Sequence, residues 1–158
     1  ILEIGTAVGY SAICFSKYLE DDGMIDTIER DPDRVKEARK NIKKAEVEQQ
    51  IQIYEGDAVE ILPTLNQTYD LVFIDAAKGK YPFFLMQAKR MLKEKGIILA
   101  DNILYKGYVL SDYNKHKQRT AVRNLREYIK ETTEDPELDT KIVEVGDGLA
   151  ISKKINSK

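Results

Sequence analysis

Two short apolar runs, each ending abruptly in a carboxylate, constrain the fold of this chain more than any other feature. Residues 69–74 are followed by Asp75, and residues 97–100 are followed by an Asp-Asn pair. Runs this short, rich in branched and aromatic residues, are typical of parallel strands that are buried on both faces. Residues 80–93 are long enough for a crossover helix, which Gly96 would end. We therefore predict two neighbouring parallel strands with their carboxyl ends side by side.

The polar side chains at these two strand ends form an all-oxygen cluster. Asp75 would lie beside Asp101 and Asn102, at the edge where open α/β sheets bind ligands. Two carboxylates and an amide carbonyl suit Mg²⁺ or Ca²⁺ better than zinc. The alternative is that acidic residues end strands simply because loops face water. The two runs alone leave both interpretations open.

The remaining segments alternate between strand and helix patterns. The expected strands are 1–4, 24–28, 51–54, 141–145 and 149–152, and the expected helices are 10–19, 31–45, 58–62 and 119–130. Two glycines at 146 and 148 join the last two strands as a hairpin. This order predicts an α/β fold with a doubly wound, Rossmann-like sheet that is mostly parallel and ends in a C-terminal antiparallel hairpin.

Length and composition narrow the class of protein. The 158 residues predict one domain, 1–158, and the net charge of −2 argues against a protein that binds nucleic acid with its whole surface, though not against a local basic patch. A single cysteine, Cys14, allows no intrachain disulfide and favours the cytoplasm. No apolar run approaches the roughly 20 residues that a membrane-spanning helix needs. Because Ile1 already lies in an expected core strand, we expect an N-terminal segment to be missing.

The turn after the first strand indicates a nucleotide-like ligand that lacks a pyrophosphate. Residues 5–9 begin and end with glycine, which lets a ligand approach the backbone N–H groups at a helix start. However, the turn is not G-x-G-x-x-G, and Glu3 lies two residues before its first glycine. This carboxylate would repel a pyrophosphate, but it would suit the ammonium group of an amino acid.

Side chains at the following strand ends match the other parts of such a ligand. Glu29 could accept hydrogen bonds from a ribose diol, Asp57 could accept from an adenine amine, and Ser11 could hold a carboxylate. A ligand with these groups and no phosphate is S-adenosylmethionine. Each residue alone could equally be a cap, a turn residue or a solvated acid, but their order at consecutive strand ends favours the cofactor.

Five segments together resemble a known enzyme family. They are residues 2–11, 28–31, 56–58, 73–78 and 100–102. Over essentially its whole length the sequence resembles the class I, divalent-metal-dependent O-methyltransferases related to catechol and caffeoyl-CoA O-methyltransferases. Residues 101–107 and 135–152 are similar to a bacterial subgroup, the tRNA 5-hydroxyuridine methyltransferases, which make 5-methoxyuridine at the wobble position.

The resemblance implies a Rossmann-like methyltransferase domain with specific roles for the site residues. Asp75, Asp101 and Asn102 would carry Mg²⁺, with Mn²⁺ or Ca²⁺ as alternatives, and Lys78 would be the general base. The divalent cation would lower the pKa of a substrate hydroxyl and hold it in line with the sulfonium methyl group. S-adenosylmethionine would bind at Glu3, Gly5, Ser11, Glu29, Asp57, Ala58 and Asp75. The family commonly dimerises, so a homodimer is expected.

Two substrate classes carry the pair of vicinal oxygens that such a site would chelate. The first is tRNA, through the 5-hydroxyl and 4-carbonyl of 5-hydroxyuridine, and the alternative is a catechol-like small-molecule phenol or vicinal diol. A tRNA would need a basic and partly aromatic rim around the site. The candidates for this rim are Lys78, Lys80, Tyr81, Tyr105, Lys106, Tyr108, Tyr113, Lys115, His116, Lys117, Arg119, Arg123 and Arg126. The alternative interpretation of residues 119–126 is an ordinary solvated helix face.

Two further alternatives belong to other functional classes. A nicotinamide-dependent oxidoreductase could share the fold, but the missing G-x-G-x-x-G motif and the Asp-Asn pair argue against it. A non-catalytic RNA-binding module would not need the intact set of Asp75, Lys78, Asp101 and Asn102. We therefore predict a Mg²⁺-dependent O-methyltransferase that uses S-adenosylmethionine, with 5-hydroxyuridine in tRNA as the preferred substrate.

Overall fold

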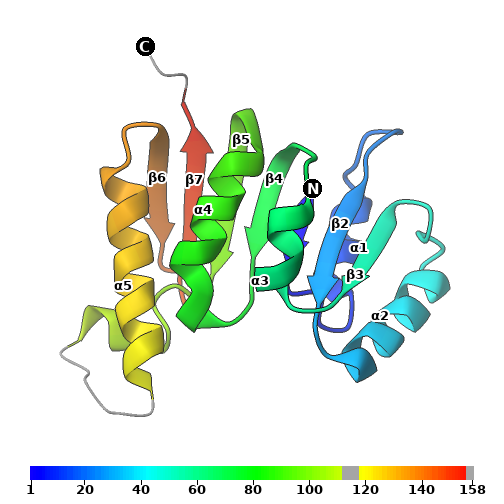
Figure 1. Cartoon of the computed structure of the whole chain (residues 1–158), viewed down its shortest axis with the longest axis horizontal. Coiled ribbons are helices and arrows are strands. Elements are labelled where there is room, and N and C mark those ends of the chain that lie inside the picture. Colours follow the sequence, from blue (N-terminus) through cyan, green and yellow to red (C-terminus); the bar gives the residue numbers. More distant parts are fainter. Residues whose placement is uncertain (112–117, 156–158) are drawn as a thin grey trace. The chain divides into compact units, whose positions relative to one another are not determined.

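The computed structural model describes residues 1–111 and 118–155. Contacts within the chain divide it into two compact units, Ile1–Asn66 and Gln67–Lys158, and each unit is described by itself (Figure 1). Within the described ranges, none of the helices is long and apolar enough to cross a bilayer. That residues 1–158 act as one methyltransferase domain stays a prediction.

The first unit is built on three parallel strands. Its strands are β1 (Leu2–Ile4), β2 (Ile25–Glu29) and β3 (Ile51–Glu55), and its helices are α1 (Tyr10–Ser16), α2 (Pro32–Lys44) and α3 (Ala58–Ile61). β2 lies between β1 and β3, with Ile28 opposite Ile4 on one side and Tyr54 on the other. All three strands therefore point their carboxyl ends to the same edge, where the predicted cofactor residues follow.

The local sequence of helix α2 determines where this helix begins and which of its faces is buried. The Asp31 carboxylate accepts hydrogen bonds from the backbone N–H groups of Asp33 at 3.0 Å and Arg34 at 3.3 Å, and a proline occupies the first helical position. Spacing by three and four residues then places Val35, Ala38 and Ile42 on one buried face. This face packs with residues of α1, β2 and β3 in a hydrophobic core, namely Ala12, Ile25, Ile51 and Ile53.

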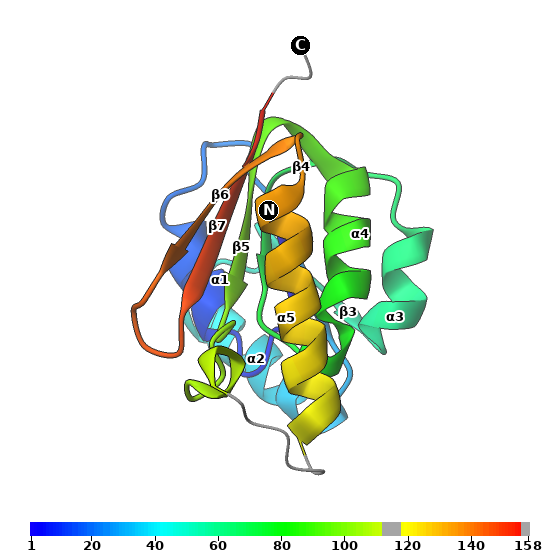
Figure 2. The ribbon, with the colours of Figure 1, turned by 90° about the vertical axis from the view of Figure 1, so that its left-hand side faces the viewer.

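The second unit joins a parallel pair of strands to an antiparallel pair. Its strands are β4 (Tyr69–Ile74), β5 (Leu92–Asp101), β6 (Leu138–Val143) and β7 (Leu149–Lys154), and its helices are α4 (Tyr81–Met91) and α5 (Arg119–Glu134). β4 and β5 are parallel, and β7 lies between β5 and β6, antiparallel to both. Both helices lie on the same face of this sheet and contact each other (Figure 2). The predicted parallel neighbours and C-terminal hairpin are confirmed.

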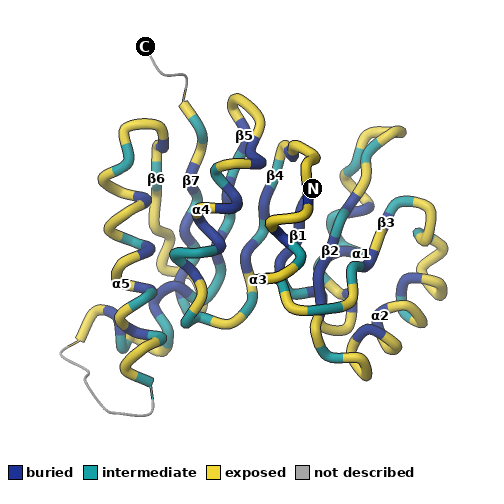
Figure 3. Tube along the Cα trace, in the orientation of Figure 1, coloured by how far each residue is buried: buried dark blue, intermediate teal, exposed yellow. Residues whose placement is uncertain are grey.

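One face of the second unit's sheet is buried under the helices. Val72 of β4 pairs with Ile98 of β5, which pairs with Ser152 of β7, and all three are fully buried. The next residue in this row is Thr140 of β6, whose hydroxyl donates to the carbonyl oxygen of Thr132 in α5 at 2.7 Å. In Figure 3 the central strands β4 and β7 are largely buried or half-buried, whereas most of the edge strand β6 and the outer turns of α5 are exposed. The strands thus form a fixed base for the loops at their ends.

The structure corrects the expected end of the crossover helix. α4 ends at Met91 and β5 begins at the next residue, so Gly96 lies inside the strand and does not end the helix. The pairing of β4 with β5 shifts register between Tyr69 and Leu71, which marks a bulge in this part of β5. A Cβ atom at Gly96 would lie 2.8 Å from the carbonyl oxygen of Lys93. The glycine therefore serves a close backbone approach within the bulge.

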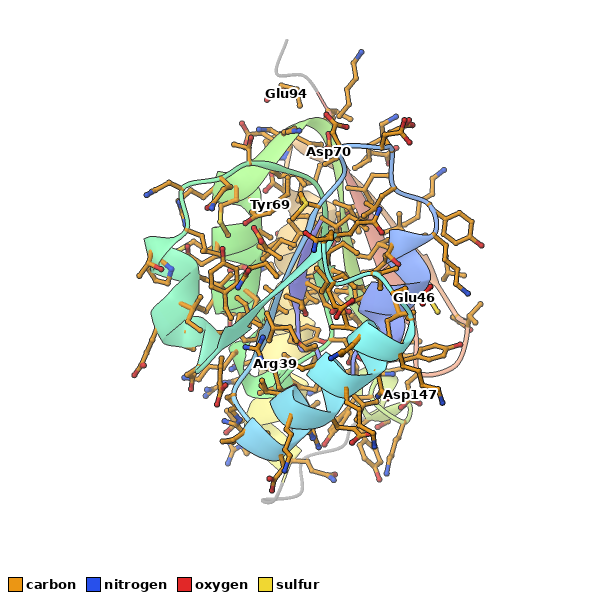
Figure 4. All side chains as sticks on the ribbon, turned by 90° about the vertical axis from the view of Figure 1, so that its right-hand side faces the viewer. Arg39, Glu46, Tyr69, Asp70, Glu94 and Asp147 are labelled. Atoms are coloured by element: carbon orange, nitrogen blue, oxygen red, sulfur yellow. The ribbon has the colours of Figure 1, made fainter. Side chains whose placement is uncertain are left out.

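Ion pairs mark the end of the second unit that lies away from the strand carboxyl ends. Lys93 Nζ lies 2.9 Å from Asp70 Oδ2, and Lys154 Nζ lies 2.9 Å from Glu94 Oε1. Figure 4 shows Asp70 and Glu94 at one end of this unit and Asp147, in the turn between β6 and β7, at the other. These pairs are thus remote from the predicted metal residues.

Candidate active site

The carboxyl ends of β4 and β5 bring three of the predicted site residues together. The two strands pair in register up to Ile74 and Ala100, so Asp75 and Asp101 are the next residues on neighbouring strands. The chain after Asp75 turns through a short 3₁₀ helix, Lys78–Lys80, which brings the Lys78 amine back over the strand ends. Lys78 Nζ lies 3.3 Å from Asp75 Oδ1 and 3.1 Å from the carbonyl oxygen of Asp101.

The Lys78 amine is largely removed from water. Its side chain is only 14% exposed, whereas that of Asp75 is 43% exposed. Burial lowers the pKa of the Lys78 amine, and the negative charges of Asp75, Asp101 and Asp147 offset only part of this effect. A lysine with a lowered pKa is better suited to accept a proton near neutral pH than a solvated lysine is.

The Asp101-Asn102 pair has a conformation of its own. The Asp101 Oδ1 atom accepts a hydrogen bond from the backbone N–H of Asn102 at 2.7 Å, and Asn102 has a left-handed φ of 57°. This contact orients the Asp101 carboxylate at the end of β5. Among the described residues, no group of three or more His, Cys, Asp and Glu side chains gathers as a metal site. The predicted donor set contains two carboxylates and an amide, a chemistry that fits Mg²⁺, and its role stays a prediction.

The predicted cofactor residue Glu3 lies inside a network of hydroxyl groups. Glu3 is fully buried, and its Oε2 atom accepts a hydrogen bond from the Thr27 hydroxyl at 2.6 Å. Its Oε1 atom accepts from the hydroxyl of Ser11, another predicted cofactor residue. The Thr27 hydroxyl also lies 2.6 Å from that of Thr6. Glu3 thus fixes the start of α1 to β1 and β2, while the predicted contact with an ammonium group is untested.

Glu29 anchors the glycine-containing turn. Its Oε2 atom accepts from the backbone N–H of Ala7 at 2.9 Å, and its Oε1 atom accepts from those of Arg30 and Asp31, each at 3.0 Å. Ala7 has a left-handed φ of 46°, a conformation that costs free energy for a residue with a side chain. Glu29 therefore holds the turn after β1 in place, and a ribose would have to share a carboxylate already used by the backbone.

Asp57 and Ala58 form the start of a short helix. The Asp57 Oδ1 atom accepts a hydrogen bond from the backbone N–H of Val59 at 2.8 Å, which makes Asp57 the N-cap of α3. Ala58 is the first residue of this helix. The cap role is therefore established for Asp57, and the predicted contact with adenine is untested. Gly5 lies in the turn after β1, where its N–H donates to Ile28 O at 3.0 Å.

The structure alters the predicted basic rim. Tyr81 is fully buried, so its assignment to an exposed rim is wrong. Arg126 is exposed, but its guanidinium donates to the carbonyl oxygens of Val109 at 3.1 Å, Tyr108 at 3.2 Å and Ser111. It therefore fixes the loop that follows Asp101. Lys80, Lys106, Arg119 and Arg123 are exposed, whereas Tyr113, Lys115, His116 and Lys117 lie outside the described residues.

Sequence reasoning missed the role of Asp147. Its backbone carbonyl accepts from the N–H of Leu104 at 2.8 Å, which attaches the β6–β7 turn to the loop after Asp101. The negative charge of its carboxylate raises the pKa of Lys78 and so offsets part of the lowering that burial causes. A Gly-Asp-Gly turn signals a hairpin, and nothing in it reveals that the hairpin returns to the end of β5.

Comparison with known proteins places the chain in a family. The sequence profile of the O-methyltransferase family matches residues 1–155. The chain is 36% identical, over 132 residues, to the catechol O-methyltransferase of Niastella koreensis, and 33% identical, over 127 residues, to that of Mycobacterium tuberculosis. These alignments cover 81% and 80% of this chain, and it spans 58% of each of these relatives.

A solved structure extends the likeness to the fold. The O-methyltransferase TomG from Streptomyces achromogenes, which is involved in tomaymycin synthesis, was solved in complex with SAM. It matches 98% of this chain and 72% of its own length with a TM-score of 0.90 and 26% identity. The predicted α/β, Rossmann-like methyltransferase fold is therefore confirmed, and the oxidoreductase alternative loses its basis. This chain belongs to the O-methyltransferase family.

Proposed function

We propose that the complete protein transfers a methyl group from S-adenosylmethionine to a hydroxyl oxygen of a substrate with two vicinal oxygens. The observation that carries this proposal is the largely buried Lys78 amine beside Asp75 and the end of β5. An amine that is shielded from water has a lowered pKa, so it is suited to accept the proton that a hydroxyl loses on methylation.

A divalent cation completes this proposal. Asp75, Asp101 and Asn102 would hold Mg²⁺, which would supply the positive charge that lowers the pKa of a substrate hydroxyl. The backbone N–H of Asn102 orients the Asp101 carboxylate, so one of the donor groups is already fixed. Lys78 would take the proton at Nζ, and its limited exposure would keep water from competing for it.

S-adenosylmethionine is the proposed methyl donor, in keeping with the SAM complex of TomG. The groups that would contact it are those that the sequence predicts, namely Glu3, Gly5, Ser11, Glu29, Asp57, Ala58 and Asp75. The turn that Glu29 holds would present backbone N–H groups to the amino-acid part of the cofactor. We expect the cofactor to bind this turn as it stands, without a rearrangement of the backbone.

A catechol-like phenol is the first proposed substrate, because two relatives at 36% and 33% identity are catechol O-methyltransferases. The second candidate is 5-hydroxyuridine in tRNA, whose 5-hydroxyl and 4-carbonyl form an equivalent pair. The exposed side chains of Lys80, Lys106, Arg119 and Arg123 favour this candidate, since they could contact phosphates. The edge-to-face pair of Tyr105 and Tyr108, with ring centroids 5.9 Å apart, could stack on a base.

The test measures methyl transfer from labelled S-adenosylmethionine to catechol and to tRNA carrying 5-hydroxyuridine, with Mg²⁺ and with chelator. Asp101→Ala should abolish transfer to either substrate. Asp70→Asn is the matched control, because it alters a carboxylate at the opposite end of β4. Transfer to tRNA that weakens steeply with salt would favour the second candidate. Transfer that persists in chelator would contradict the proposed metal, and no transfer to either substrate would contradict the proposed reaction.

We also propose a homodimer in the cytoplasm. Size-exclusion chromatography with light scattering on the complete protein tests the dimer, and a single monomeric species would contradict it.

A further inference from the structure

Tyr81 stands directly beside the candidate base. It is the first residue of α4, one turn after Lys78, and it is fully buried. Its hydroxyl accepts a hydrogen bond from Lys78 Nζ at 2.6 Å, the shortest contact recorded for that amine. The same hydroxyl donates to the carbonyl oxygen of Asp101 at 2.8 Å. Tyr81 thus links the amine to the end of the neighbouring strand.

A lysine side chain needs such a link to hold one position. It has four rotatable methylene groups, and fixing them costs conformational entropy that a single exposed ion pair does not recover. Asp75 is a weak anchor for Lys78, because it is exposed and lies 3.3 Å away. The Tyr81 hydroxyl is buried, and its ring also lies 4.8 Å from Lys78 Nζ. The tyrosine is therefore the stronger of these two anchors.

Helix α5 holds Tyr81 and the turn before it. Thr120, Asn124 and Tyr128 are spaced four residues apart and so lie on one face of the helix. Asn124 Nδ2 donates to the carbonyl oxygen of Gly79 at 2.6 Å. The Tyr128 ring packs edge-on against Tyr81 with centroids 5.5 Å apart. The position of the Tyr81 hydroxyl is therefore fixed by packing and by a hydrogen bond to the turn.

We propose that the hydroxyl of Tyr81 is a positioning group that holds the Lys78 amine between the ends of β4 and β5. This inference rests on the proposed function, in which Lys78 accepts the proton of the substrate hydroxyl. Tyr81 does not touch the substrate in this scheme. It acts through Lys78 by limiting the places that the amine can occupy.

Tyr81→Phe removes the hydroxyl and keeps the ring. We expect kcat to fall about 10–100-fold, as for the loss of other outer partners that orient a functional group, with KM for S-adenosylmethionine within about twofold. Tyr128→Phe is the matched control, because its buried hydroxyl has no hydrogen-bond partner among the described residues. It should leave kcat unchanged. An unchanged kcat in Tyr81→Phe would overturn the proposal.

A second readout does not depend on activity. In protein labelled with ¹³C at lysine Cε, the NMR order parameter of Lys78 reports how far its side chain moves, and Lys78→Met identifies the signal. Tyr81→Phe should lower this order parameter, whereas Tyr128→Phe should not. An unchanged order parameter overturns the positioning role even in an inactive protein. If Tyr81→Phe lowers the order parameter of Lys78 but the wild-type protein methylates neither substrate, the proposed function is contradicted and the positioning role of Tyr81 is retained.

Discussion

Glu3 and Glu29 in the first unit have surroundings opposite to those of Asp75 in the second. In the first unit Glu3 and Glu29 are buried, and they accept hydrogen bonds from the protein's own hydroxyl and backbone N–H groups. In the second unit Asp75 is exposed and faces the largely buried amine of Lys78. The first arrangement fixes a backbone turn, whereas the second leaves two charged groups available for chemistry. Substitution of Glu29 should therefore lower the stability of the fold, whereas substitution of Lys78 should lower activity and leave the fold intact.

The largest effect is expected at Lys78. Lys78→Met keeps most of the side-chain volume and removes the amine, so it should lower kcat about 10²–10⁴-fold, the usual contribution of a general base. Methyl transfer to catechol and to tRNA carrying 5-hydroxyuridine measures the loss. Thermal unfolding should stay cooperative, because a desolvated amine contributes little to stability.

Lys80→Met is the matched control, since Lys80 lies in the same turn and is exposed. It should retain transfer to catechol. If Lys78→Met unfolded the protein instead, Lys78 would be needed for stability, as Glu29 is expected to be, and the two units would not differ in this respect.

Glu29 should show the opposite behaviour. Glu29→Ala leaves the backbone N–H groups of Ala7, Arg30 and Asp31 without their acceptor, which should cost about 3 kcal/mol of unfolding free energy. Urea unfolding measures this change. The exposed Glu55, its register partner on β3, is the control, and Glu55→Ala should cost less than about 0.5 kcal/mol. Equal losses at the two positions would show that the buried contacts of Glu29 do not stabilise the turn.

Asp135 tests whether contact between a carboxylate and a lysine is enough to make an active site. In the second unit Lys89 forms an ion pair with Asp135 and lies 3.5 Å from Glu137. Partial burial is the largest single effect and raises the pKa of Asp135, but the hydrogen bond and charge of Lys89 and the backbone N–H of Glu137 together outweigh it and lower the pKa of this carboxyl. Its stabilising effect is then present above the pKa of the unfolded chain and is lost as the pH falls through the lower, folded value.

Asp135→Asn should therefore cost about 1 kcal/mol at neutral pH and less in acid, with no effect on methyl transfer. Unfolding in urea across the acidic range measures the difference between variant and wild type. A difference that stays constant with pH would contradict the assigned ion pair.

Local signals made part of the fold predictable from sequence. The Asp31 cap and the following proline set the start of α2 because both act through neighbouring residues. The two apolar runs predicted the parallel pairing of β4 and β5, since strands buried in this way carry no polar alternation. The position of Gly96 was misread, because the bulge in β5 depends on its register with β4, which no local pattern reveals.

The site was less predictable, for a related reason. Tyr81 follows two lysines in the sequence, which predicts an exposed aromatic residue. In the structure it is covered by α5, which begins some 40 residues later. Arg126 reads as a cation for a ligand, but its guanidinium binds carbonyl groups of a loop that precedes it in the chain. In both cases the partner is distant in sequence, so only the tertiary structure identifies it.

The smallest effect is expected at Asp70, which sharpens the comparison within a single strand. β4 has a carboxylate near each end, and each faces a lysine: Lys93 lies 2.9 Å from Asp70, and Lys78 lies 3.3 Å from Asp75. The lysines differ in burial, because the Lys93 side chain is 47% exposed and that of Lys78 is 14% exposed. The hydrogen bond from Lys93 lowers the pKa of Asp70, but solvent screens this pair. Asp70→Asn should thus change the unfolding free energy by less than about 0.5 kcal/mol and leave methyl transfer intact. A loss of activity in this variant would mean that burial of the lysine does not distinguish the two ends of β4.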